Sequence, residues 1–307
     1  MDSRRLGSSE LSVSRLALGS WRTFERIGRE RGLVVMQAAR EHGITFLDDA
    51  RYNDETGTAP IPTGYSELLF GELFRAAGWH RDEVVVANKL WWEFWPRESA
   101  AEELESSLER MGFEYVDLIY ANPPPDGLGI SEMVAAVGEL MCAGKARTWG
   151  IVNWQAGPFL EASRAAAEQG VPQPCAAQLP YSLVRRDWVE SREMGDALAA
   201  SGAGVVASFV MAGGVLTGKY DRCGTGRASR EIDDPTLAPA RDCGRRLRAL
   251  SEELGTNPGA LAIAFALANP AVVSVLFGAT SPEQIAENTR AVALGPDIGE
   301  RLRALCA

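Results

Sequence analysis

The chain contains 307 residues, 46% of them hydrophobic, and carries a formal net charge of −10 at pH 7. This length and apolar content predict one large domain that spans residues 1–307 around a single core. Acidic and basic residues are interleaved along the chain, and this balance argues against nucleic acid or an anionic membrane as a partner. A small-molecule anion needs only a local positive site and stays compatible with the composition.

Eight short apolar runs alternate with amphipathic helical stretches. In chain order the runs read RLALGS, TFLDD, VVVANK, VDLIYAN, TWGIVN, CAAQLP, GVVASF and VVSVLFG, and helical stretches end at Gly43, Gly78, Gly112, Gly144, Gly170, Gly202 and Gly255. Glycine ends helices readily because it lacks a Cβ and adopts the left-handed conformation. Eight buried strands that alternate with helices predict an α/β protein with a (β/α)8 TIM barrel and long βα loops.

The chemistry of such a barrel lies where its strands end. The residues at these ends are Ser20, Asp48, Lys89, Asn122, Asn153, Gln178, Phe209 and Gly278. Long segments follow the second run (53–65) and the seventh run (221–239), and we expect them to be lids or binding loops. For the first segment, a solvated insertion is an equal alternative.

Three helices have clear sequence signals. SAAE, which begins at Ser99, is a capping box, and SPEQ at 281–284 is a second one that carries proline at the first helical position. The segment 258–269 is apolar on all sides and predicts a buried helix. Because GATSPEQ places a helix N-terminus directly after the last run, it is also a candidate anion site.

Asp48 and Lys89 end consecutive runs, so both side chains are expected to project into the barrel mouth. A buried lysine needs a counter-charge, and the aspartate would supply it. A cation in this place also stabilises the ionised form of a nearby phenol, and Tyr52 and Tyr65 flank the loop after the second run. The pair predicts a catalytic centre; a salt bridge that only joins two strands is the alternative.

Histidine chemistry is excluded, because His42 and His80 are the only histidines and neither ends a run. A Ser-His-Asp triad and a histidine-rich metal site are therefore ruled out, and no metal is expected. Tyrosine, lysine, a carboxylic acid or water must donate protons. The segment WWEFW (91–95) would line the mouth with flat apolar surface, so Trp91 and Trp92 are assigned to a substrate pocket, with core packing as the alternative.

The cysteines are scattered, odd in number and without metal-ligand spacing: Cys142, Cys175, Cys223, Cys243 and Cys306. Free thiols in a reducing cytoplasm fit best. The N-terminal segment has no apolar leader-like stretch, and no run approaches membrane-spanning length. We expect a soluble, cytoplasmic protein, and the sequence leaves open whether it is a monomer or a homo-oligomer.

Several motifs, in order, resemble the aldo-keto reductase family. LGSSELSVSRLALGSW is similar to its opening hairpin and first strand, GITFLDDA to its second strand with a catalytic aspartate, and VVVANK to its third with a catalytic lysine. GGVLTGKY and GATSPEQIAEN resemble its cofactor loop and its last dinucleotide-binding helix. The resemblance spans residue 6 to about residue 292, and SLERMGFEYVDLIYANPPPD is similar to the branch that contains potassium-channel β subunits.

The resemblance implies NADPH bound in extended form across the barrel mouth. It implies Ser20 and Trp21 near the cofactor, Asn153 and Gln178 at the carboxamide, Lys219 at the pyrophosphate, Arg227 at the 2′-phosphate, and Thr280, Gln284, Glu287 and Asn288 at the adenosine end. The family's SPLAGG segment reads SFVMAGG here and lacks the usual aromatic residue, so Phe209 is expected to stack on the nicotinamide instead.

Two departures from the family pattern concern proton transfer. Family members carry the catalytic tyrosine five residues after the aspartate, whereas here Tyr52 follows Asp48 by four and Asn53 holds the usual position. Either Tyr52 still delivers its phenol after a local rearrangement, or the donor is Tyr65, or the donor is missing. Asn122 stands where most members carry histidine, which removes an acid but keeps a hydrogen bond that orients a carbonyl.

Together these features predict NADPH-dependent reduction of an aldehyde or ketone in a small apolar, aromatic or glycosyl substrate. Tyr52 would protonate the oxygen, Lys89 would assist it and Asp48 would position Lys89, while Asn122 would orient the carbonyl. Trp91, Trp92 and Tyr65 would shape the pocket. An NADPH-binding redox-sensing or regulatory protein with weak or no turnover is the alternative, as is an imine or enone reductase. A barrel aldolase with Lys89 as Schiff-base nucleophile leaves the last-helix motif unexplained.

Overall fold

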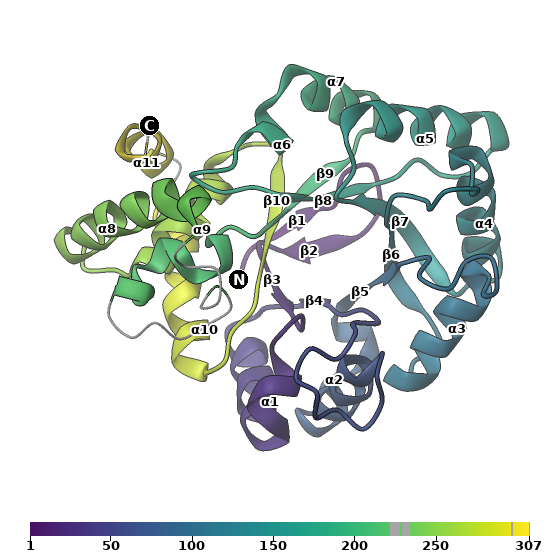
Figure 1. The fold of residues 1–307 in the computed structure, drawn as a ribbon, viewed down its shortest axis with the longest axis horizontal. Helices are drawn as coiled ribbons and strands as arrows, with labels where there is room; N and C mark the ends of the chain where they lie inside the picture. The colour runs from purple at the N-terminus through teal and green to yellow at the C-terminus, as the bar shows by residue number, and fades with distance from the viewer. Residues whose placement is uncertain (222–227, 229–233, 296, 307) are drawn as a thin grey trace.

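The structure, a computed structural model, describes residues 1–221, 228, 234–295 and 297–306. Parallel strands close into a barrel in the order β10-β3-β4-β5-β6-β7-β8-β9 (Figure 1). They are β3 (Leu16–Gly19), β4 (Phe46–Asp48), β5 (Val85–Leu90), β6 (Val116–Ala121), β7 (Ala146–Val152), β8 (Ala176–Pro180), β9 (Gly204–Ser208) and β10 (Val272–Phe277). Each predicted run supplies one of these strands, so the (β/α)8 prediction is confirmed.

Helices surround the barrel, and α8 to α11 gather on one side of it (Figure 1). The α-helices are α1 (Phe24–Glu41), α2 (Tyr65–Ala76), α3 (Ala100–Met111), α4 (Ile130–Cys142), α5 (Ala156–Gln169), α6 (Asp187–Glu190), α7 (Arg192–Ser201), α8 (Ala238–Glu253), α9 (Pro258–Ala268), α10 (Pro282–Thr289) and α11 (Ile298–Leu305). Short 3-10 helices are η1 (Arg81–Glu83), η2 (Ala212–Thr217), η3 (Lys219–Asp221), η4 (Pro235–Leu237) and η5 (Arg290–Ala293). In the part of the chain that is described, no helix combines the length and the apolar character that crossing a membrane requires.

The helix signals in the sequence correspond to real helix ends. The seven predicted helix-ending glycines all have φ between 64° and 74°, the left-handed region in which the missing Cβ matters. Ser99 forms the predicted capping box at the start of α3, where its side chain accepts a hydrogen bond from the Glu102 N–H. Residues 259–267 of α9 are all buried, as its all-round apolar sequence predicts.

A hairpin of β1 (Ser3–Arg5) and β2 (Ser12–Ser14) covers the end of the barrel where the strands begin. Leu6 and Val13 of this hairpin are fully buried in one cluster with Phe46 and Val85, the first residues of β4 and β5. Gly7 lies so close to the barrel that a Cβ there would stand 2.2 Å from the backbone oxygen of Cys175. The hairpin therefore plugs the end opposite to Asp48 and Lys89.

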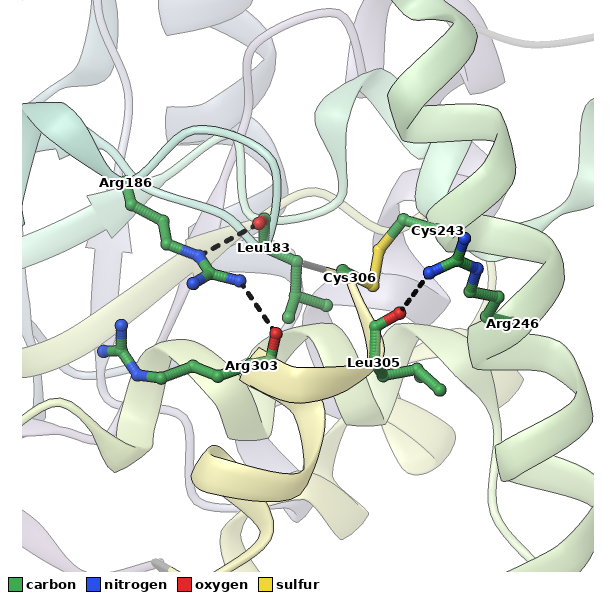
Figure 2. Close-up of a disulfide and its surroundings, with 7 residues drawn as sticks. All are labelled: Leu183, Arg186, Cys243, Arg246, Arg303, Leu305 and Cys306. Carbon is green, nitrogen blue, oxygen red and sulfur yellow. Dashed lines mark hydrogen bonds between the residues drawn. A yellow bond between two sulfur atoms is a disulfide. The ribbon is translucent and has the colours of Figure 1, made fainter.

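The prediction that all cysteines are free is wrong for one pair, because Cys243 of α8 forms a disulfide with Cys306 (Figure 2). The two residues are 63 positions apart in the sequence, so their spacing carried no signal, yet the fold brings their Cα atoms to 5.2 Å. Arg246 of α8 donates to the Leu305 carbonyl oxygen at 2.8 Å, and Arg186 donates to that of Arg303 at 3.3 Å, so hydrogen bonds and the disulfide together hold the end of α11 (Figure 2). Cys142 and Cys175 are free thiols, and Cys223 lies outside the described residues.

Candidate active site

A buried ion pair lies at the ends of two neighbouring strands. Lys89 of β5 donates from Nζ to Oδ1 of Asp48 at the end of β4. Gln178 of β8 reaches across the barrel and donates from Nε2 to Asp48 Oδ2 at 2.9 Å. The three residues are at most 4% exposed, so each charge has a hydrogen-bonding partner where water does not reach it. The ion pair and the amide form the floor of the barrel mouth.

Tyr52 reaches this floor although it stands one position earlier than the family pattern. Its hydroxyl oxygen lies 3.2 Å from Lys89 Nζ, which donates to it. The chain turns tightly after β4, because the Tyr52 N–H donates to the Ala50 carbonyl oxygen at 2.8 Å. This turn brings the phenol back toward Lys89, whereas Tyr65 begins α2 and its hydroxyl interacts with Arg29 of α1. The geometry therefore favours Tyr52 as the tyrosine of the cluster.

Asn122 and Trp92 lie beside the cluster, and the Trp92 indole binds the backbone of Asn122. The Asn122 amide donates from Nδ2 to the Leu90 carbonyl oxygen at 3.0 Å, and the Trp92 indole donates to the Asn122 carbonyl oxygen at 3.0 Å. Trp92 is 4% exposed, which is the environment of a supporting side chain. Trp91 is only half-buried, and its ring meets the Tyr52 ring edge-on with centroids 5.9 Å apart. Of the two tryptophans, Trp91 is the one whose ring contacts Tyr52.

The loop 53–65 forms one side of a pocket next to Tyr52. The pocket is lined by Trp21, Arg22, Glu25, Tyr52, Asn53, Asp54, Glu55, Ala59, Tyr65 and Ser66. Glu55 from this loop pairs with Arg22 at 2.6 Å, and the Arg22 guanidinium lies over the Trp21 ring at 4.6 Å. The loop 53–65 is thus anchored to the segment that follows β3. It therefore lies at the mouth of the barrel, on the face where the strands end.

Strained backbone marks the rim of the mouth. Arg22, Trp92, Asn153 and Phe209 all have φ between 52° and 61° and follow β3, β5, β7 and β9. Non-glycine residues rarely adopt this conformation, and it concentrates at functional sites. Phe209 is 44% exposed and meets Trp21 edge-on at 5.5 Å, so two aromatic rings stand open at the rim. Asn153 is also exposed, and its backbone N–H donates to the Gln178 carbonyl oxygen at 3.0 Å.

The remaining cofactor candidates gather around η2 and α10. Gly213 and Gly214 of η2 have φ of 68° and 91°, and a Cβ on Gly214 would stand 2.9 Å from Cε of Lys219. At the start of α10, the Thr280 N–H donates to Gln284 Oε1 at 2.8 Å. On the same helix Asn288 is buried, and Glu287 is exposed. Arg227 lies outside the described residues.

Sequence reasoning missed Asp49, the second aspartate of the DD pair. Asp49 is fully buried and accepts a hydrogen bond from the Ser20 hydroxyl. Burial, together with the charge of nearby Glu67, raises the pKa of the Asp49 carboxyl well above its usual value. Ser20, assigned to the cofactor, is thus also a partner of this acid. The sequence did contain a signal for this residue, because Asp49 directly follows the end of the second predicted strand.

The comparisons agree with this geometry. A sequence model of the aldo/keto reductase family matches residues 15–300, so the chain belongs to that family. A protein of Oryza sativa subsp. japonica named as a probable voltage-gated potassium channel subunit beta is 31% identical over 329 aligned residues, which cover 99% of this chain and 96% of the relative. A protein of the same name from Arabidopsis thaliana is 31% identical over 316 residues, which cover 96% and 92%. The family resemblance seen in the sequence is confirmed, including the similarity to potassium-channel β subunits.

Proposed function

We propose that the protein is an NADPH-dependent oxidoreductase that reduces the carbonyl of a small aldehyde or ketone. The observation that supports this most strongly is the hydroxyl of Tyr52 at 3.2 Å from the ammonium of Lys89, which is itself paired with Asp48. When bound, the nicotinamide supplies a hydride to the carbonyl carbon. The carbonyl oxygen of the substrate then needs a proton, which a side chain next to that oxygen must donate.

Tyr52 is the group that donates this proton. After donation the phenolate is stabilised by the Lys89 ammonium, whose own charge is held by Asp48. Asn122 has a second amide N–H that can donate to the carbonyl oxygen, because the first is used by Leu90. Tyr65 lines the pocket beside Tyr52, Trp91 extends the apolar surface next to the Tyr52 ring, and Trp92 holds the backbone of Asn122.

The described residues fit a dinucleotide. Gly213 and Gly214 of η2 have left-handed backbone and no side chain, and the Lys219 side chain lies next to Gly214. A pyrophosphate could therefore approach both the backbone of η2 and the Lys219 ammonium closely. The N-terminus of α10, capped by Ser281, favours a second anionic group. The residues that would hold NADPH are Ser20, Trp21, Asn153, Gln178, Phe209, Lys219, Thr280, Gln284, Glu287 and Asn288, with Arg227 proposed from the sequence alone.

Substitution of Lys89 tests this function. In Lys89→Met the methionine fills similar space without the charge, so turnover of a carbonyl panel is expected to fall below detection while NADPH still binds. NADPH affinity is measured by quenching of tryptophan fluorescence, and turnover by the loss of absorbance at the nicotinamide band. If the wild-type protein neither binds nor consumes NADPH with any substrate of the panel, the proposal is wrong.

A regulatory protein that binds NADPH with little turnover is the second candidate. Asn122 in place of an acid favours it, and so do the relatives, which are named as channel subunits. Tight NADPH binding by the wild-type protein without consumption across aldehydes, ketones, imines and enones would support this candidate over the enzyme.

A further inference from the structure

Arg51, next to the proposed proton donor, is held by a set of partners from the segment after β5. Its Nη1 donates to both carboxylate oxygens of Glu98, at 2.7 and 2.9 Å, and its Nη2 lies 3.1 Å from Glu103 Oε1. The guanidinium also lies over the Phe94 ring at 5.0 Å. The Arg51 side chain is 3% exposed, so these contacts are made away from water, where charge-assisted hydrogen bonds are strong.

Glu103 connects Arg51 to the start of the same segment. From α3 its carboxylate accepts the backbone N–H groups of Trp91 at 2.7 Å and Trp92 at 3.1 Å. Burial raises the pKa of the Glu103 carboxyl, while the Trp91 N–H and the Arg51 charge oppose that change. Glu103 therefore depends on Arg51 for its counter-charge, and both fix the backbone that directly follows Lys89 and Leu90 in β5.

Both chain neighbours of Tyr52 are bound to this segment. Arg51 precedes the tyrosine, and Asn53 follows it and donates from Nδ2 to Glu93 Oε1 at 2.9 Å. The Tyr52 ring also meets Trp91 edge-on. The backbone of Tyr52 is thus attached on both sides to the segment that continues the Lys89 strand.

The geometry points to Arg51 as a positioning residue that sets the distance between the Tyr52 hydroxyl and Lys89 Nζ; this inference rests on the proposed role of Tyr52. Arg51 acts on Tyr52 indirectly, by fixing the chain directly before it to the segment that follows β5. Such a tie is needed here because Tyr52 reaches Lys89 only through the tight turn at Ala50. The planar guanidinium binds Glu98 with two hydrogen bonds and approaches Glu103 at the same time, a geometry that lysine reproduces only in part.

The first experiment measures kcat, KM and NADPH affinity in Arg51→Met and Arg51→Lys. A tyrosine displaced by about 1 Å costs roughly 100-fold in rate, so Arg51→Met is expected to lower kcat by about 30-fold or more. KM and the NADPH dissociation constant should stay within about twofold, because Arg51 is not among the proposed binding residues. Arg51→Lys keeps the charge and is expected to recover part of the loss.

Arg81→Met is the matched control. Arg81 is also a mostly buried arginine paired with a buried carboxylate, Asp117 at 2.7 Å, but it precedes β5 at the plugged end of the barrel. This variant should lose stability and keep the wild-type kcat. Equal loss of kcat in Arg81→Met and Arg51→Met would reduce the role of Arg51 to general stability and overturn the inference.

A double-variant cycle separates positioning of Tyr52 from other effects. If Arg51 acts through the phenol, Arg51→Met causes little further loss of kcat in a Tyr52→Phe background, whereas an independent role gives the same fold-loss in both backgrounds. A crystal structure of Arg51→Met provides a readout without turnover. The inference expects the Tyr52–Lys89 distance to lengthen from 3.2 Å, and an unchanged distance overturns it even if the wild-type protein proves to be inactive.

Discussion

The two ends of the barrel each hold a buried aspartate, and the partners of the two carboxylates differ. At the plugged end, Asp117 of β6 forms ion pairs with Arg81 at 2.7 Å and Arg147 at 2.9 Å, and it accepts a hydrogen bond from the Val86 N–H at 2.9 Å. At the mouth, Asp48 binds Lys89 and Gln178 instead. Both ends include a tyrosine hydroxyl, because Lys89 donates to Tyr52 at 3.2 Å and Arg147 donates to Tyr115 at 3.0 Å. The difference lies in burial: the Lys89 side chain is 4% exposed, whereas those of Arg81 and Arg147 are 20% and 56% exposed. Burial of an ion pair alone therefore does not distinguish the mouth of the barrel from its plugged end.

Substitution of Tyr52 should have the largest effect and tests the mouth directly. Tyr52→Phe removes the proposed proton donor and keeps the ring against Trp91, so kcat is expected to fall roughly 1,000-fold, within the range for loss of a general acid. Tyr65→Phe serves as the matched control, since this tyrosine lines the pocket but interacts with Arg29. Steady-state kinetics of both variants show which tyrosine is the proton donor. A larger loss of kcat in Tyr65→Phe than in Tyr52→Phe would assign that role to Tyr65.

The disulfide lies apart from both the Asp48 and the Asp117 clusters. Its removal should have the next largest effect, which we expect on stability. It closes a loop across 63 positions of the sequence, so reduction, or Cys243→Ser, is expected to lower the free energy of unfolding by about 3 kcal/mol. Denaturant unfolding with and without a dithiol measures this change, and kcat below the transition should remain that of the oxidised protein. Identical unfolding curves in the two conditions would show that the bond does not form in solution.

Substitution of Asp117 tests the plugged end of the comparison. Asp117→Asn leaves two arginines without a counter-charge, but both are partly exposed, with side chains that are 20% and 56% accessible to solvent. We therefore expect a loss of about 2 kcal/mol in unfolding free energy, less than for a fully buried pair, and an unchanged kcat. Thermal unfolding and steady-state kinetics together give the answer; a large fall in kcat would mean that the two ends are coupled.

Much of the fold was predictable because it depends on local signals. The eight apolar runs and the glycines that end helices are short-range patterns, and all of them correspond to observed elements. The proximity of Asp48 and Lys89 was also predictable, because both end consecutive strands of a parallel barrel.

The rest of the site, and the disulfide, depend on contacts between residues that are distant in sequence. Arg51 and Glu98 are 47 positions apart, and the disulfide spans 63, so no periodicity or motif connects them. Whether Tyr52 or Tyr65 meets Lys89 depends on one tight turn at Ala50, a backbone detail that residue spacing does not determine. The Asp117 cluster was missed for the same reason.

Substitution of Ser99 should have the smallest effect and asks how firmly the mouth depends on helix α3. Ser99→Ala removes the side-chain acceptor of the capping box and should cost about 1 kcal/mol of unfolding free energy. Ser191→Ala is the control, because Ser191 caps α7 in the same way through the Met194 N–H. The two capped helices differ in their contacts, because α3 carries Glu103, which binds the backbone of Trp91 and Trp92. Both variants should therefore unfold at similarly lower denaturant concentrations, while only Ser99→Ala shows a small decrease in kcat, of about twofold. An equal decrease in Ser191→Ala would indicate that the mouth responds to overall stability and not to the position of α3.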